Sequence, residues 1–162
     1  MNIQNFLKTL KKEGKLKLVS PSREVKLSYF KKAENCIKSS KLLFKNNLYE
    51  NSVSESYYAM YNSLLALLFS VGIKSENHSA SIILLKFLFN QEELVKLIDK
   101  SKRERIEKQY YVSTEENLNL LKLSAKELIS ESESFLLGIR ALINSFNNEK
   151  IDFFRRSFLK LI

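Results

Sequence analysis

The sequence predicts an all-α protein, an antiparallel up-and-down four-helix bundle with short additional helices. Two observations carry this prediction. One proline and three glycines in 162 residues are too few for a turn-rich β protein and are typical of long, uninterrupted helices. Apolar residues also recur at steps of three and four along most of the chain, which is the period of a helix that buries one face. A hydrophobic content of 44% is enough for such a chain to fold around a core.

The first third of the chain predicts two helices. Residues 2–13 form a short amphipathic helix that ends at Gly14, and residues 15–19 link it to the next element. Ser20 and Pro21 predict an N-cap followed by a proline at the first helical position. The helix that follows runs to about residue 44. Its inward face is expected to carry Leu27, Phe30, Ala33, Ile37, Ser40 and Phe44.

Residues 49–71 are the most informative stretch. One helical face would carry Val53, Tyr57, Met60, Tyr61, Leu64, Leu67, Leu68 and Val71, and two large apolar residues, Leu65 and Phe69, lie off that face. A helix that is apolar on more than one side must be covered on more than one side. We therefore expect a central helix of the bundle, with one flank left for a ligand or a second subunit.

The second half of the chain predicts four more elements and a loop. A polar loop spans residues 72–77. Residues 79–90 are apolar almost all round and predict a short buried helix, with a buried strand as the alternative. A further helix is expected at 91–111, with Leu94, Leu97, Ile98 and Ile106 on its inward face. A capping box at Ser113–Glu116 opens a long helix that reaches Phe146 and carries Leu118 on its inward face. A last helix is expected at 151–161.

This organisation is expected to be a single helical domain over residues 1–162. It would comprise an N-terminal helix and linker at 1–19, the bundle at 20–148 and a C-terminal helix at 149–162. No leader peptide is apparent at the N-terminus, and the longest apolar run is far shorter than the roughly 20 residues that span a bilayer. We expect a cytoplasmic protein with no membrane partner.

The charge is unevenly distributed. The net charge is +9, and residues 1–50 carry 12 Lys and Arg against 4 Glu, which is a local net charge of +8. A basic face can attract phosphate backbones or an acidic protein, and a solvated lysine-rich surface is the alternative. One histidine, one cysteine (Cys36) and scattered carboxylates lack the clustering that a metal site needs, so neither a metal nor another cofactor is expected.

Several residues are candidates for binding. Tyr57, Tyr58 and Tyr61 could stack on bases, or could fill the bundle as structural residues. His78 could transfer a proton or contact a nucleotide, or could cap or pack at a helix start. A basic group with nearby aromatic residues could hold phosphates and stack on bases, or could pair internally, for example Arg103 with Glu107. Its members are Lys102, Arg103, Arg105, Lys108, Tyr110 and Tyr111. The serine- and glutamate-rich stretch 130–134 is expected to be a solvated helix face.

Three of these segments together resemble a known family. Val53-x-x-x-Tyr57-Tyr58-Ala59-Met60-Tyr61 resembles the A-x-x-x-Y-Y-A-M-F helix of HEPN domains, and Gly72 to His78 resembles the G-y-x-x-K-x-H loop after it. Arg105-x-x-x-x-Tyr110 is similar to the R-x-x-x-D-Y end of the family's fourth helix. The resemblance covers nearly the whole chain and is greatest to small stand-alone prokaryotic members.

The resemblance implies a helical bundle that forms homodimers and is paired with a minimal nucleotidyltransferase, as toxin and antitoxin or as a two-part complex. Active relatives are ribonucleases that use an R-x(4–6)-H motif. This chain departs from that pattern, since Lys108 stands where the histidine would follow Arg103, and no arginine precedes His78 at that spacing. Lysine is a poor general base near neutral pH. We therefore expect a non-catalytic or weakly active module that binds a nucleotide, RNA or a nucleotidyltransferase partner. One alternative is a metal-independent ribonuclease toxin that uses Arg103 or Arg105 with an unusual second residue. Another is a purely structural partner subunit with no nucleic-acid role.

Overall fold

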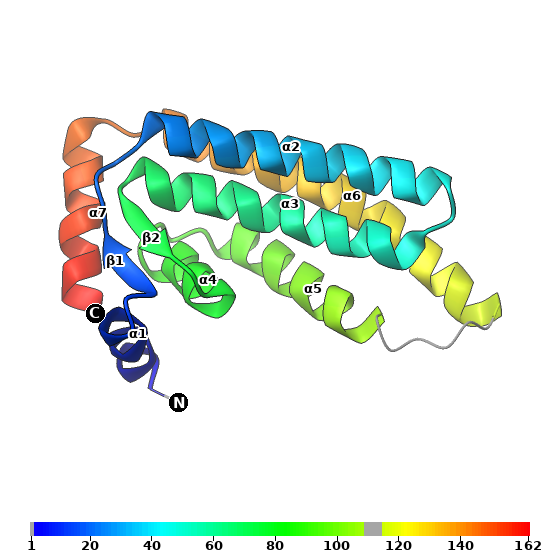
Figure 1. Ribbon diagram of the computed structural model, residues 1–162, viewed down its shortest axis with the longest axis horizontal. Coiled ribbons are helices and arrows are strands. Elements are labelled where there is room, and N and C mark those ends of the chain that lie inside the picture. The colour runs from blue at the N-terminus through cyan, green and yellow to red at the C-terminus, as the bar shows by residue number, and fades with distance from the viewer. Residues whose placement is uncertain (1, 109–114) are drawn as a thin grey trace.

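The computed structural model describes residues 2–108 and 115–162, which form seven helices and one two-stranded sheet (Figure 1). The all-α prediction is confirmed. In chain order the elements are α1 (Ile3–Lys12), β1 (Leu16–Leu18), α2 (Arg23–Lys45), α3 (Tyr49–Ser70), β2 (Ile73–Ser75), α4 (His78–Phe87), α5 (Glu92–Lys108), α6 (Glu115–Asn144) and α7 (Asn148–Leu161).

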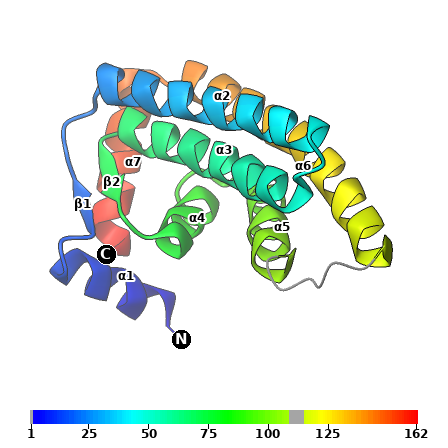
Figure 2. The same cartoon turned by 45° about the vertical axis from the view of Figure 1, so that its right-hand side comes forward.

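The four long helices α2, α3, α5 and α6 form the bundle, and α3 is its centre. Helix α3 packs against α2, α5 and α6 (Figures 1 and 2), and most of its residues from Ser52 to Leu68 are buried. Helix α4 fills the space between the end of α3 and the start of α5, while α7 crosses the end of the bundle (Figure 1). The prediction that α3 is covered on several sides is therefore confirmed.

The start of α2 differs from the prediction. Ser22, not Ser20, is the N-cap, because its hydroxyl oxygen accepts a hydrogen bond from the backbone N–H of Val25 at 3.1 Å. Pro21 therefore precedes the cap instead of opening the helix. The inward face is as expected from Phe30 to Ser40, but Leu27 is 52% exposed. The residues that lead from a short strand into α2 are held against the end of α3, because the backbone N–H groups of Val19 and Ser22 donate to the carbonyls of Gly72 and Phe69.

That strand belongs to a small sheet that the sequence did not reveal. The linker at 15–19 contains β1, and the expected loop at 72–77 contains β2; the two pair antiparallel, with Leu16 opposite Ser75. Gly72 makes the turn out of α3 with a φ of +72°, a conformation that favours glycine. A Cβ there would also lie 2.1 Å from Arg155 Nη1, which donates hydrogen bonds to the carbonyls of Val19 and Val71.

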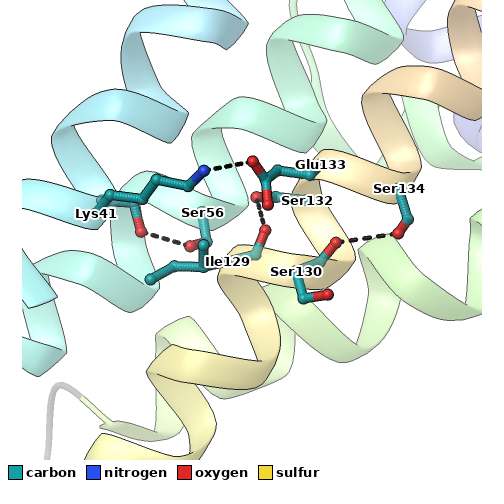
Figure 3. Close-up of polar contacts among 8 residues, drawn as sticks. Lys41, Ser56, Ile129, Ser130, Ser132, Glu133 and Ser134 are labelled. Atoms are coloured by element: carbon teal, nitrogen blue, oxygen red, sulfur yellow. Dashed lines mark hydrogen bonds and ion pairs between the residues drawn. The ribbon is translucent and has the colours of Figure 1, made fainter.

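The second half of the chain largely agrees with the prediction. Residues 78–87 are a helix, so the strand alternative is wrong. On α6, Leu121, Ala125, Leu128, Phe135 and Ile139 are buried, but Leu118 is 45% exposed. Ser132 is buried within the stretch that was expected to be solvated, and its hydroxyl donates to the carbonyl of Ile129 (Figure 3). Tyr110, Tyr111 and the start of the expected capping box lie outside the described residues.

Within the part of the chain that the structure describes, no helix combines the length and apolar character that crossing a bilayer requires.

Candidate functional site

The flank of α3 that faces α4 gathers three stacked rings. The His78 ring lies on the Tyr61 ring with centroids 3.7 Å apart and an interplanar angle of 15°. The Tyr57 hydroxyl and His78 Nδ1 share a hydrogen bond of 2.5 Å. Tyr57 and Tyr61 are one helical turn apart and therefore lie on the same face of α3. His78, which was expected to cap a helix or to transfer a proton, thus packs on the tyrosine side chains of α3.

His78 reaches this position because of the way α4 begins. Asn77 is the N-cap of α4, and its side chain accepts a hydrogen bond from the backbone N–H of Ala80 at 3.0 Å. This cap makes His78 the first residue of the helix. The capping role that was one reading of His78 therefore belongs to its neighbour, and the imidazole packs on the rings of α3.

Helix α5 brings a cation to the same rings. The Arg105 guanidinium carbon lies 5.5 Å from the Tyr57 ring centroid and 5.2 Å from that of Tyr58. Both distances are within the range of a cation–π contact. The inward face of α5 had been predicted to end with Ile106, but Ile106 is 43% exposed. Instead that face runs through Ile98, which is buried, to Arg105, so an apolar stripe becomes cationic as the helix proceeds.

Burial and the neighbouring cations determine the protonation states. Burial lowers the pKa of His78, and the charges of Lys102 and Arg105 lower it further. Burial raises the pKa of Tyr57 well above its usual value. At neutral pH the imidazole and the phenol are therefore both uncharged, and the local charge comes from Arg105 and Lys102. Lys102 Nζ donates to the Ser79 hydroxyl at 2.9 Å, beside the imidazole in the chain.

We refer to six side chains as the aromatic–basic cluster: Tyr57, Tyr58, Tyr61, His78, Lys102 and Arg105. They come from α3, α4 and α5. Tyr57 is fully buried and Tyr61 is 8% exposed, so these two serve as structure that holds the imidazole and the guanidinium. Tyr58 remains half-buried and is the tyrosine of the three that an incoming base could touch.

The predicted basic group on α5 is divided between two sides of the helix. Lys108 is buried and pairs with Glu104 at 3.3 Å. Glu104 in turn accepts a hydrogen bond from the Ser124 hydroxyl of α6 at 2.6 Å. Lys108 thus belongs to the contact between α5 and α6, and is not part of the cluster. Arg103 is exposed and lines a shallow surface hollow together with Asp99, Lys102 and Ile106.

Two features of this region were not expected from the sequence. Ser79 and Asp99 were not among the candidates, yet both lie beside Lys102. The spacing of three between Asp99 and Lys102 was the available signal, because it places both on one side of α5.

Cys36 lies outside the cluster, and burial raises the pKa of its thiol to about 12, as expected for a packing residue.

Among the described residues, His, Cys, Asp and Glu side chains form no group of three or more that could hold a metal ion. The arrangement can instead hold an anion. Two cations with an uncharged imidazole and a partly exposed aromatic ring suit a phosphate with an attached base.

Comparison with known proteins identifies a family and a relative of this chain. The HEPN domain family model matches residues 27–142, which include α3, α4, α5 and most of α6. A protein of Methanocaldococcus jannaschii named "Putative toxin MJ0605" is 30% identical over 115 residues, which is 67% of this chain and 81% of the relative.

Proposed function

The chain belongs to the HEPN domain family, and from this premise we propose that it binds RNA or a nucleotide through the aromatic–basic cluster. We further propose that it is the toxin-like member of a two-protein pair. The relative that bears a toxin name supports the second part. The cluster supports the first part.

The observation that carries the binding proposal is the environment of Arg105. Its guanidinium faces the rings of Tyr57 and Tyr58, and no ion pair of the described residues involves Arg105 or Lys102. A partly buried cation without a carboxylate retains its capacity to bind an anion. A phosphate placed between Arg105 and Lys102 would supply the missing counter-charge.

The partner is proposed from the family resemblance. A minimal nucleotidyltransferase is the expected second protein, and a homodimer is the expected assembly of this chain. A homodimer built on α3 would have to use its partly exposed strip, which includes Tyr58 and Asn62, because the chain's own helices bury Tyr57 and Tyr61. That strip adjoins Arg105, so a second copy bound there would lie beside the cluster.

A second candidate function is RNA cleavage, and the position of His78 favours it. No arginine precedes this histidine at the family's spacing, but the fold brings Arg105 close enough to lower the pKa of the imidazole. An uncharged imidazole can accept the proton of a ribose 2′-hydroxyl, whose oxygen then bonds to phosphorus. The bond from phosphorus to the 5′-oxygen breaks, that oxygen takes a proton from solvent water, and Arg105 stabilises the extra negative charge.

Binding is tested by fluorescence anisotropy with a labelled single-stranded RNA of eight nucleotides. Arg105→Ala should weaken binding at least about tenfold, because a contact between a charged group and phosphate contributes roughly 1.5–3 kcal/mol. Arg156→Ala, which removes an exposed arginine of α7, is the matched control and should change little. Equal losses in both variants would show that the cluster is not the binding site.

Cleavage is tested on the same RNA by gel electrophoresis. If His78 acts as a base, wild-type protein cuts the strand and leaves a 2′,3′-cyclic phosphate, while His78→Gln does not. If wild-type protein binds the strand and leaves it whole, the chain is a binding module. Cutting that survives in both His78→Gln and Arg105→Ala would contradict the role given to these residues.

A further inference from the structure

A groove of about 250 Å³ lies beside the aromatic–basic cluster, between α4 and α5. The first residues of α1 border it through Ile3. Its apolar wall consists of Ile82, Ile83, Phe87 and Val95, and its polar lining consists of Ser79, Lys86, Asp99 and Lys102. Lys102 therefore belongs to both the groove and the cluster, so the two are continuous along α5.

The apolar wall of this groove includes surface that is exposed to water. Helix α4 is apolar almost all round and is buried on the side that faces α3. Its residue Phe87 is nevertheless 52% exposed, and Ile3 of α1 is 39% exposed. The hydrophobic effect opposes the exposure of such a ring to water. A flat apolar ligand that slides between Phe87 and the α5 side would remove this surface from water.

The charge around the groove indicates what kind of flat ligand fits. Lys86 Nζ lies 5.9 Å from the Phe87 ring centroid at one side of the groove, and Lys102 stands at the other. Asp99 offsets only part of this charge, and Arg103 extends the basic lining into the neighbouring hollow. Grooves that hold single-stranded nucleic acid combine such cations along the backbone with apolar or aromatic surfaces for the bases.

We propose that this groove takes one unpaired base of an RNA strand whose adjoining phosphate lies on Lys102 and Arg105. The inference rests on the proposed RNA binding and adds the base subsite, which would make the protein prefer unpaired strands. A base inside a duplex is stacked and paired, and cannot enter the groove without leaving its partner.

The test compares two probes in the same anisotropy assay. One is the single-stranded RNA of eight nucleotides, and the other is an abasic strand with the same number of phosphates. Phe87→Ala should weaken RNA binding about tenfold, since stacking on an aromatic ring contributes about 1–3 kcal/mol per base, and should leave binding of the abasic strand unchanged. Phe153→Ala on α7, which removes a ring that is 56% exposed, is the matched control and should change neither.

Each outcome separates the groove from the cluster. If Arg105→Ala weakens both probes and Phe87→Ala weakens only the RNA, both proposals are supported. If Arg105→Ala weakens both probes but Phe87→Ala changes neither, or weakens both equally, the base subsite is wrong while the phosphate contact at Arg105 stands. If neither variant changes RNA binding, or wild-type protein does not bind the strand, the proposed function and this inference both fail.

Discussion

Two of the polar contacts of α3, one with α2 and one with α5, differ in what they leave available to a ligand. Against α2, the buried hydroxyls of Ser40, Ser52 and Ser56 bond to one another, with Ser40 Oγ 2.7 Å from Ser56 Oγ and 3.0 Å from Ser52 Oγ. Against α5, Arg105 meets the ring faces of Tyr57 and Tyr58, and no carboxylate of the described residues forms an ion pair with it. In the first contact the hydroxyl groups form hydrogen bonds with one another, whereas in the second the positive charge of Arg105 remains available to a ligand.

The difference teaches where a ligand can bind on such a bundle. Buried polar groups that satisfy one another contribute stability and specify packing, because any incoming group would first have to break their hydrogen bonds. A cation beside aromatic rings gains a modest stabilisation and can still accept an anion. The closed serine contact is therefore structural, and the open contact at Arg105 is the candidate site.

The largest effect on stability should come from the closed contact. Ser40→Ala removes the partner of the buried Ser56 hydroxyl, and an unsatisfied buried group costs about 1–3 kcal/mol of the free energy of unfolding. Urea denaturation followed by circular dichroism measures it. The triple variant with alanine at positions 40, 52 and 56 should cost less than the sum of the three single changes, because it leaves no hydroxyl unpaired. A simple sum would show that the serines do not act as a closed set.

A smaller effect on stability is expected at the open contact. Arg105→Met keeps much of the side-chain volume and removes a partly buried charge, so the lost cation–π contact and the gain from desolvation should leave the free energy of unfolding within about 1 kcal/mol of wild type. The same denaturation experiment checks this. RNA affinity should nevertheless fall as it does for Arg105→Ala. A collapse of stability would place Arg105 with the structural residues.

A change of pH should change the free energy of unfolding and the RNA affinity in opposite directions, because both depend on the protonation of His78. The pKa of His78 is lowered in the folded protein, so the unfolded chain takes up the proton first, and folding is favoured more at higher pH. This part of the stability is present above the ordinary histidine pKa of about 6.5 and declines as the pH falls through the folded value. RNA affinity should rise over the same fall, because a charged imidazole adds attraction for phosphate.

Both trends are measured by denaturation and by anisotropy between pH 8 and pH 5.5, with His78→Gln as the control. The glutamine variant should lose the part of each trend that comes from the imidazole. If the two trends in wild type run in the same direction, or if they persist unchanged in the variant, His78 is not the group responsible.

The smallest effect is expected at a surface ion pair between α2 and α6. Lys41 Nζ lies 2.5 Å from Glu133 Oε1 (Figure 3), but both side chains are nearly half exposed. Such pairs contribute about 1 kcal/mol or less. Lys41→Ala should therefore lower the melting temperature only slightly and leave RNA affinity unchanged. A loss comparable to that of Ser40→Ala would mean that exposure to solvent is not what separates the strong contacts from the weak ones.

Much of the fold could be predicted because it depends on local pattern. The spacing of apolar residues located the seven helices of the described ranges to within a few residues, and the run from Tyr49 to Ser70 was identified as the central helix. The errors fell where a single residue decides. Ser22 and Ser20 are both good N-caps by type, and backbone hydrogen bonds of Val19 and Ser22 to the end of α3 hold Ser20 outside the helix. The three-residue strands were missed because such short segments carry no recognisable period.

The candidate site was only partly visible in the sequence. Tyr57, Tyr58, Tyr61, His78 and Arg105 were named, and they lie together. Lys108 was named with them but lies against α6. The reason is that α5 presents one side to α3 and another side to α6. The groove at Phe87 was missed, because an apolar residue on an apolar helix is expected to be buried. Only the packing of the neighbouring elements shows that it is exposed.

The amino-acid sequence by itself determined the helical class, the central position of the tyrosine helix and the family, because periodic burial and local motifs act over a few residues. Tertiary structure alone decided that the imidazole of α4 stacks on α3, that Arg105 points inward while Arg103 does not, and that Phe87 stays exposed. Those outcomes depend on how helices distant in the chain pack against each other, and packing is a property of all the surfaces that meet.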